Sequence, residues 1–503
     1  MKYNILLAIL VVLAISVSCI DDETSDATRP LSEISIVEGS VKEVYNISKN
    51  ETLTIIPKIV QTNKQKPLSY TWEIELETYS NEEQFVYTGN ELGSFKCRLI
   101  VENEDGKTFF PFTLNVNTPY EEGITVISKD KDGKSHLAFM LTPTDESVEP
   151  EFASGDCFGI NNPDIFFASN PTDIIQSSGN LIISCQGAEN GNAKDVSTIY
   201  YLNEKTLVVE NMLTAPEYPD FKPTRLAIPA TGAAGVAYPI LCENGNVYEF
   251  STTEGAIAEP VKLHYNYAQS CVVNSGKGYY YDLLFWDKPA GALCLIYNGY
   301  GPYYCGKKYN MVRDTCIVGN NNYFKGKDFQ AMTLVRLTEQ QKATSYSEAI
   351  VLTNTGTILQ KTVLCTSFHV YNSETASTVL YDNGGTKMCG IGVSPITEST
   401  PCIANKTYYS LLFGKGNKVM RWNYTSSQLL TEADELLSVG SEQAVITGFE
   451  ISADHKETYV AFYEPQQEGL NGSVWVFDTD KGNVLRKYEN VCYQPVKIMY
   501  KKK

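Results

Sequence analysis

The sequence is poor in the residues on which most enzymes and nucleic-acid-binding proteins depend. Its 503 residues include only four histidines and seven arginines, and its formal net charge is -18. The histidines lack metal-ligand spacing, and no H-E-x-x-H, G-x-S-x-G or P-loop motif is present. Phosphate binding needs clustered Lys and Arg, so the composition argues against a nucleic-acid partner. We therefore predict no metal, no cofactor and no catalytic residue, and a solvated tail for Lys501-Lys502-Lys503.

The thirteen cysteines include no C-x-x-C pair, a spacing typical of zinc and thiol-redox sites. Several lie in apolar, strand-like runs, where a free cysteine behaves as a small buried hydrophobe: Cys97, Cys185, Cys294 and Cys365. The sequence thus favours free thiols over a disulfide framework. One or two disulfides, for example between Cys389 and Cys402, remain an alternative.

Long apolar runs are also scarce, and only the one over residues 5–17 stands out. It is shorter than the roughly 20 residues that a membrane-spanning helix needs, and it follows Lys2, as in a secretory signal peptide. Cys19 closes the run, and residues 21–23 are all acidic. This combination predicts a signal peptide over residues 1–18.

The pattern resembles a bacterial lipoprotein signal, in which Cys19 becomes the lipidated N-terminus of the mature chain. The acids behind it resemble the surface-export signal of Bacteroidota lipoproteins. The resemblance implies a protein that is anchored by lipid in the outer membrane and faces the cell exterior. Acyl chains contribute ~0.8 kcal/mol per buried methylene, which would make this anchor firm. Residues 19–30 are polar and acidic, so we expect a flexible tether there.

Residues 31–118 carry short alternating runs that predict an all-β domain, a β-sandwich. Trp72 lies in the clearest of these runs and is expected in the core. The Asp105-Gly106 pair predicts a hairpin between two long strands.

Two of these strands resemble those of PKD-type immunoglobulin-like domains. Residues 70–72 (YTW) match the Y-x-W strand, and residues 93–99 (GSFKCRL) match the G-x-Y/F-x-(V/C)-x-L strand. The resemblance covers residues 31–118 and implies a PKD-like fold for them. Cys97 has no second cysteine within this region, which excludes an internal antibody-style disulfide.

Residues 119–503 contain strand-and-turn units that recur without a long amphipathic helix. The clearest strands are four apolar runs, residues 199–202, 247–250, 419–422 and 474–477. The first two runs begin 48 residues apart and the last two 55, close to the blade length of a β-propeller. At ~50 to 55 residues per blade, this part of the chain predicts seven blades, with eight as the alternative. Because a propeller must close its edges, we expect the strand at 124–128, or its hairpin partner, to pair with the blade holding residues 496–500.

Two short motifs that could carry chemistry are interpreted as turns. Asp130 and Asp132 lack the spacing of an EF-hand, so a hairpin turn is predicted there instead of a calcium site. Residues 452–459 (SADHKETY) are similar to the sialidase Asp-box S-x-D-x-G-x-T-W, except that Lys456 replaces the glycine. Such boxes are structural hairpins. The separation of paired glycosidase carboxylates is invisible in sequence, which keeps a propeller hydrolase as an alternative.

Aromatic side chains concentrate between residues 279 and 309. The stretch GYGPYY at 299–304 has the glycine and proline of a loop, and WDKP at 286–289 is typical of a hairpin tip. Exposed Tyr and Trp offer flat, amphipathic faces to sugars or peptide backbones. We predict a ligand surface that includes Trp286, Tyr300, Tyr303 and Tyr304, with structural packing of these side chains as the alternative.

Over its whole length the chain resembles the PKD-like family lipoproteins of Bacteroidota, which combine a lipoprotein signal, a PKD-like domain and a propeller. The resemblance implies an accessory to a SusC/SusD-type outer-membrane importer that captures peptides or glycans without turning them over. A structural or adhesive envelope protein is one alternative, and a propeller glycoside hydrolase or lyase is another.

Overall fold

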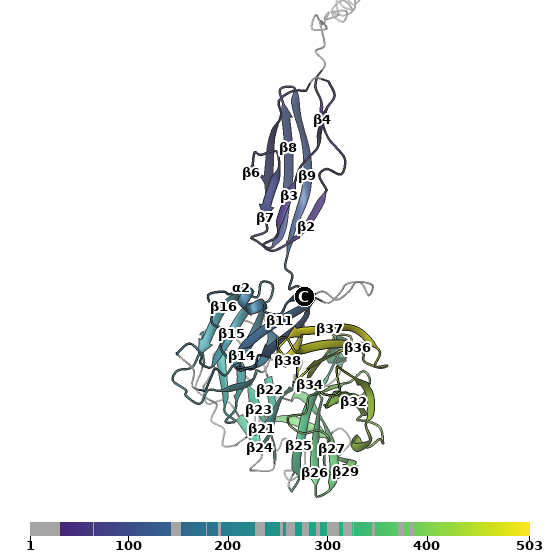
Figure 1. Ribbon diagram of the computed structural model, residues 1–503. Helices are drawn as coiled ribbons and strands as arrows, with labels where there is room; N and C mark the ends of the chain where they lie inside the picture. Colours follow the sequence, from purple (N-terminus) through teal and green to yellow (C-terminus); the bar gives the residue numbers. More distant parts are fainter. Residues whose placement is uncertain are drawn as a thin grey trace, which may run out of the picture. The chain divides into compact units, whose positions relative to one another are not determined.

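The structure is a computed structural model, and it describes residues 31–502 with gaps (Figure 1). The gaps are residues 64, 142–151, 178, 190–192, 227–236, 252–254, 258–266, 274–280, 288–291, 299–310, 315–323, 325, 345–347, 371–376 and 383–385. Only the backbone is described for residues 152–154, 237–238, 251, 267–273, 281–287, 292–298, 311–314, 342–344, 365–370 and 377–382.

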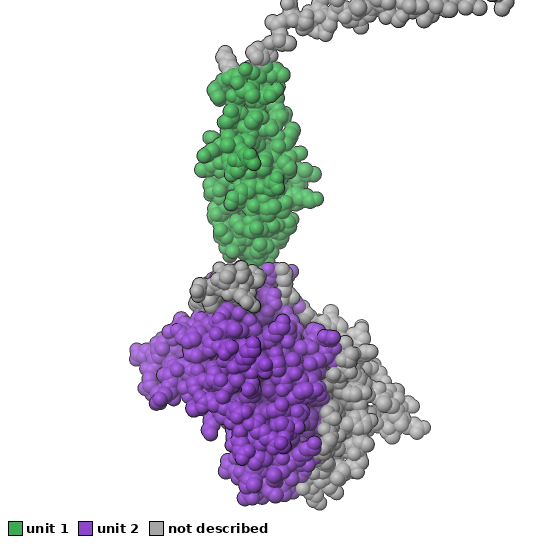
Figure 2. All heavy atoms as spheres, turned by 90° about the vertical axis from the view of Figure 1, so that its right-hand side faces the viewer, with its two compact units in different colours: residues 1–118 green, residues 119–503 purple. Residues whose placement is uncertain are grey.

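The chain forms two compact units, Met1–Thr118 and Pro119–Lys503, coloured separately in Figure 2. Almost all of their regular structure is strand. Within the described part of the chain, every helix is too short or too polar to cross a bilayer.

Unit 1 is a sandwich of antiparallel sheets with one parallel edge. One sheet has five strands in the order β2-β9-β8-β5-β6: β2 (Val44–Ser48), β9 (Gly106–Asn117), β8 (Gly93–Asn103), β5 (Ser69–Ile74) and β6 (Glu77–Ser80). Two smaller sheets pair β3 (Thr52–Ile55) with β7 (Phe85–Thr88) and β1 (Ile34–Ile36) with β4 (Ile59–Gln61). The edge strand β2 runs parallel to β9.

A single apolar cluster fills this sandwich. Trp72 of β5 is fully buried and packs against Phe85 of β7 and Phe112 of β9 at ring-centroid distances of 5.1 and 6.1 Å. Its indole Nε1 donates a hydrogen bond to the Glu82 carbonyl. The prediction that Trp72 is a core residue is confirmed. The predicted Asp105-Gly106 hairpin is also confirmed, because β8 and β9 pair from Asn103↔Gly106 to Gly93↔Val116.

Unit 2 consists of successive antiparallel meanders. The first is completed by the last strand of the chain, in the order β12 (Phe152–Ser154), β11 (Ser135–Leu141), β10 (Gly123–Lys129) and β38 (Gln494–Lys501). The second meander holds β13 (Pro171–Ser177), β14 (Asn180–Cys185), β15 (Thr198–Asn203) and β16 (Val209–Thr214). The third holds β17 (Pro223–Leu226), β18 (Ala237–Cys242), β19 (Val247–Ser251) and β20 (Ala256–Ile257). The fourth holds β21 (Tyr267–Val273), β22 (Tyr281–Asp287), β23 (Ala292–Asn298) and β24 (Met311–Asp314).

A larger sheet joins two further meanders through a parallel contact between β25 and β30. It holds β25 (Asp328–Arg336), β26 (Glu348–Thr355), β27 (Ile358–Val370), β28 (Ser377–Asp382), β29 (Lys387–Ile391), β30 (Cys402–Asn405), β31 (Ser410–Lys415), β32 (Lys418–Asn423) and β33 (Asp434–Ser438). The last meander is β34 (Val445–Ile451), β35 (Glu457–Tyr463), β36 (Gly472–Asp478) and β37 (Val484–Cys492). Short helices are α2 (Cys157–Asn161), α3 (Glu339–Thr344) and the 3-10 turn η3 (Leu430–Glu432).

First strands of neighbouring meanders lie next to one another in most of this unit. The closing strand β38 contacts both β34 and β13, β13 contacts β17, β21 contacts β25, and β30 contacts β34. Strand β38 pairs with β10 over its length, from Gly123↔Lys501 to Lys129↔Gln494. Meanders that join through their first strands, with the C-terminal strand completing the N-terminal sheet, are the architecture of a β-propeller. The all-β fold and the predicted pairing of the two ends of this unit are confirmed.

The four apolar runs found in the sequence occupy equivalent places. Each forms the third strand of its meander: β15, β19, β32 and β36. Three of these strands end in an Asn or Asp whose side-chain oxygen accepts hydrogen bonds from the backbone N–H groups two and three residues on: Asn203, Asn423 and Asp478. This local turn chemistry explains why the repeat is visible in the sequence.

Two expectations about particular residues need correction. Lys501 is not part of a solvated tail, because it ends β38, is 1% exposed and donates from Nζ to the Glu121 carbonyl at 2.6 Å, whereas Lys502 is exposed as expected. The Lys502 N–H donates to Gln176. The alternative of a Cys389–Cys402 disulfide is wrong, because both are free thiols.

The expected buried thiols at Cys97 and Cys185 are confirmed, and burial raises the pKa of the Cys97 thiol to about 11 and that of Cys185 to about 12. The side chains of Cys294 and Cys365 lie outside the described residues.

Candidate functional site

Most of the residues predicted to carry function lie outside the described part of the chain. This applies to Cys19 and to Tyr300, Tyr303 and Tyr304. Trp286 belongs to β22, where only the backbone is described.

The strand register places the backbone of Trp286 within the β22–β23 hairpin. In the β22–β23 hairpin, Trp286 pairs with Leu293 near the turn, whereas Tyr281 pairs with Asn298 at the opposite end. The chain leaves β23 at Asn298 and enters the segment that holds the three tyrosines. At ~3.3 Å per residue, that segment starts about 17 Å from Trp286. Trp286 therefore lies at the turn end of this hairpin, and Tyr300, Tyr303 and Tyr304 lie outside the described residues.

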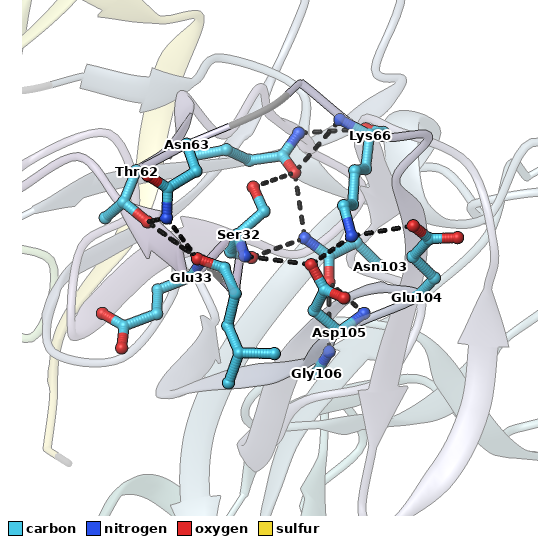
Figure 3. A network of polar contacts seen from close by, with 11 residues as sticks. Ser32, Glu33, Thr62, Asn63, Lys66, Asn103, Glu104, Asp105 and Gly106 are labelled. Atoms are coloured by element: carbon cyan, nitrogen blue, oxygen red, sulfur yellow. Dashed lines mark hydrogen bonds and ion pairs between the residues drawn. The ribbon is translucent and has the colours of Figure 1, made fainter. Parts of the chain in front are cut away.

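The described residues contain a buried polar network where the chain enters unit 1, and we call Ser32, Gln61, Lys66, Asn103 and Asp105 the clasp (Figure 3). Ser32 is 1% exposed, and its backbone N–H donates to Asp105 Oδ2 at 2.9 Å. Its carbonyl accepts from Asn103 Nδ2 at 2.8 Å. Its hydroxyl donates to Gln61 Oε1 at 3.1 Å. Every polar group of Ser32 thus has a partner, two of them in the β8–β9 turn and one in β4.

The clasp also neutralises its own buried charge. Lys66 forms ion pairs with Asp105 and, at 2.7 Å, with Glu104. Gln61 Nε2 donates to the Lys66 carbonyl at 2.9 Å, and its Oε1 also accepts from Asn103 Nδ2 at 2.9 Å. Buried polar groups are costly unless all are satisfied, so this network fixes one arrangement of the chain at residue 32.

Sequence reasoning found one part of the clasp and missed the rest. The turn at Asn103–Gly106 carries a recognisable signal, since Asn103 Oδ1 accepts from the N–H groups of Asp105 and Gly106. Ser32 gave no signal, because its partners Gln61, Asn103 and Asp105 lie 29, 71 and 73 residues away along the chain. Whether a side chain between a tether and a strand is buried can be known only when the pairing of the strands is known.

A second polar group lies beside the strands that close the propeller. Arg486 of β37 donates from Nη1 to Glu457 Oε1 at 3.0 Å, and Tyr459 donates to the other oxygen of Glu457 at 3.1 Å. Tyr459 stacks on Tyr500 of β38 with centroids 5.6 Å apart. Burial, followed by the neighbouring Glu457 carboxylate, raises the pKa of Tyr459 well above its usual value. Tyr459 therefore stays neutral and joins the last meander to the closing strand.

Ion pairs also connect strands that belong to different meanders. Lys497 of β38 lies 3.7 Å from Asp173 of β13, and Arg336 of β25 lies 3.1 Å from Glu450 of β34. Each pair links two different meanders, so these charges support the ring. Among the residues that the structure describes, no group of three or more His, Cys, Asp and Glu side chains is arranged to hold a metal ion.

The two motifs interpreted as turns are hairpin turns in the structure. Asp130 Oδ1 accepts from the N–H groups of Asp132 and Lys134 between β10 and β11. Between β34 and β35, Asp454 Oδ1 accepts from the Ser452 hydroxyl at 2.7 Å. His455, and not the following residue, takes the left-handed conformation with φ of 64°. Both interpretations are confirmed.

Comparison with known proteins gives only distant structural likeness. No family model matches the chain, and no curated protein matches it. A quinonprotein alcohol dehydrogenase-like protein from Bacteroides thetaiotaomicron is similar over 93% of this chain and 99% of its own, with 15% identity and a TM-score of 0.48. The β-propeller domain of Cps50 (Swd1) from Myceliophteria thermophila is similar over 64% of this chain and 86% of its own, with 10% identity and a TM-score of 0.38. At these values, neither name transfers to this chain.

Proposed function

We propose that this protein is a surface-exposed outer-membrane lipoprotein that captures peptides or glycans for a SusC/SusD-type importer without altering them chemically. The observation that carries the proposal is Cys19, which closes the one long apolar run and is followed, after Ile20, by three acidic residues. In this proposal residues 1–18 are removed, Cys19 carries the lipid, and residues 19–30 connect it to the clasp.

Unit 1 then acts as a PKD-like spacer and unit 2 as the receptor. A fully buried Trp on an inner strand of a sandwich supports the first assignment, since it is a hallmark of immunoglobulin-type domains. For unit 2 we propose seven blades. The described strands support this count. The largest sheet consists of two meanders that meet at the parallel β25–β30 pair, and five further four-stranded meanders bring the number to seven.

Capture is assigned to the aromatic residues of the fourth meander. Tyr and Trp side chains bind sugars and peptides by stacking and hydrogen bonding, which requires no nucleophile, metal or perturbed pKa. Trp286 lies in β22, and the three tyrosines belong to a segment outside the described residues, so the proposal tests Trp286 and the tyrosines separately.

The test is purification of the tagged native protein from outer membranes, with identification of the proteins and the peptides or glycans that accompany it. Tyr300→Ala, Tyr303→Ala and Tyr304→Ala combined, and Trp286→Ala separately, are expected to weaken capture by ~1 to 2 kcal/mol per hot-spot residue at an unchanged melting temperature. The exposed aromatic Tyr409 of another meander serves as the matched control, and Tyr409→Ala is expected to leave capture unchanged.

Two outcomes contradict the proposal. Turnover of peptides or glycans at enzymatic rates would replace capture with hydrolysis. A collapse of the fold in the tyrosine variant, with capture intact in whatever remains folded, would show that these aromatic residues are packing and that the site lies on another loop.

A further inference from the structure

The clasp lies on a direct path between the two ends of unit 1. The tether reaches the fold at Ser32, whose backbone is held by Asn103 and Asp105 of the β8–β9 turn (Figure 3). Strand β9 begins in that same turn, at Gly106, and ends at Asn117, two residues before unit 2 begins at Pro119. A pull on the tether therefore passes from Ser32 to the turn and along β9 to unit 2, without crossing the rest of the sandwich.

The strand pairings of the N-terminal segment would also resist a pull along β9. Strand β2 runs parallel to β9 from Val44↔Thr113 to Ser48↔Asn117, so the two ends of unit 1 emerge at opposite ends of this pair. Pulling these ends apart slides β2 against β9 and loads all ladder hydrogen bonds together, instead of opening them one by one. The Ser32 hydrogen bonds of the clasp carry load together with the β2–β9 ladder, and so does the pairing of β1 with β4.

We propose that unit 1 is a load-bearing joint in which the clasp transmits tension from the tether directly to β9 and so protects the sandwich from being unravelled at its N-terminus. The proposal rests on the proposed lipid anchor only for the origin of the tension. The clasp geometry and its response to force belong to unit 1 itself. Anchoring and force resistance therefore have separate readouts.

The experiment is single-molecule force spectroscopy on the full chain without its signal peptide, held at residue 21 and at the C-terminus. Unfolding of residues 31–118 is recognised by a gain in length of about 300 Å. Asp105→Ala removes the charged acceptor of the Ser32 N–H, and we expect unfolding of unit 1 at constant load to become about tenfold faster, since hydrogen bonds to charged groups are stronger than those between neutral groups. Asn103→Ala, which releases the Ser32 carbonyl, should act in the same direction.

A second pulling geometry separates load transmission from simple stability. With the handle moved to the exposed position 91, ahead of β8, tension no longer passes through residue 32. We expect Asp105→Ala to have little effect there. Asp105→Asn keeps an acceptor oxygen for Ser32 and should recover most of the resistance in the first geometry. The surface pair Glu102–Lys107 of the same hairpin, 3.0 Å apart, gives the control: its double alanine variant should match the parent in both geometries.

The proposal is overturned if Asp105→Ala accelerates unfolding equally in both geometries, because the clasp would then be only a stabilising contact. It is also overturned if neither Asp105→Ala nor Asn103→Ala changes the unfolding rate when the tether is pulled.

Discussion

The two units bury their apolar side chains in different ways. In unit 1 one cluster around Trp72 fills the space between the sheets. In unit 2 the described buried side chains fall into several clusters, each drawn from neighbouring sheets, such as the one that holds Ile182 of β14 and Ile240 of β18. A substitution in the core of unit 1 should therefore destabilise the whole of unit 1. A substitution in one cluster of unit 2 should destabilise mainly the two meanders that form that cluster.

The units also fix opposite ends of the chain. Unit 1 holds its N-terminal segment with the clasp and the parallel β2–β9 pair. Unit 2 holds its C-terminal segment as β38, which pairs with β10 and contacts β13 and β34. We therefore expect a terminal strand to matter most where a ring depends on closure, and less where a core is already enclosed.

The largest effect is expected from removing the closing strand. Ending the chain at Cys492 deletes β38, exposes the edge of β10 and takes Ile498 out of its buried cluster. We expect the cooperative melting of unit 2 to disappear while the transition of unit 1 remains, as measured by calorimetry. Ending the chain after Lys501 keeps β38 and removes only the Lys502 contacts, so it should melt almost like the parent. Unchanged melting of the first variant would show that the ring does not depend on β38.

A smaller and confined effect is expected from the other core. Trp72→Ala should cost ~3 to 5 kcal/mol in unit 1 through lost burial and the cavity left behind. The transition of unit 2 should stay in place, because its clusters contain no residue of unit 1. One transition that shifts as a whole would contradict the division into two separate cores.

The smallest effect concerns a buried lysine between two meanders of unit 2. Lys361 of β27 is 6% exposed, lies 4.9 Å from the Trp422 ring and donates to the Tyr424 carbonyl, and burial lowers its pKa from 10.5. Because the folded state disfavours the proton, stability is reduced at low pH and rises with pH up to about 10.5. Urea unfolding should show this rise in the parent relative to Lys361→Met. Equal pH dependence of the two proteins would mean that Lys361 keeps its ordinary pKa.

The features predicted from sequence are those with short-range signals. Trp72, the Asp105-Gly106 hairpin and the four third strands of meanders follow from alternation and turn residues within about ten positions. The pairing of β10 with β38 could also be predicted, because a ring has only two ends to join.

Long-range polar contacts could not be predicted in this way. Lys501 looked like part of a charged tail because its acceptor, the Glu121 carbonyl, lies 380 residues away. Ser32 and its Asn103 partner are 71 residues apart, so nothing near Ser32 in the sequence marks it as buried.

The most direct test of the account is membrane fractionation of the parent and of Cys19→Ala, combined with protease treatment of intact cells. The account predicts that the parent is in the outer-membrane fraction and open to protease, and that the variant is soluble or mislocalised with both melting transitions unchanged. A Cys19→Ala protein that still fractionates with the outer membrane and is cleaved at the cell surface would contradict the lipid anchor and, with it, the proposed role.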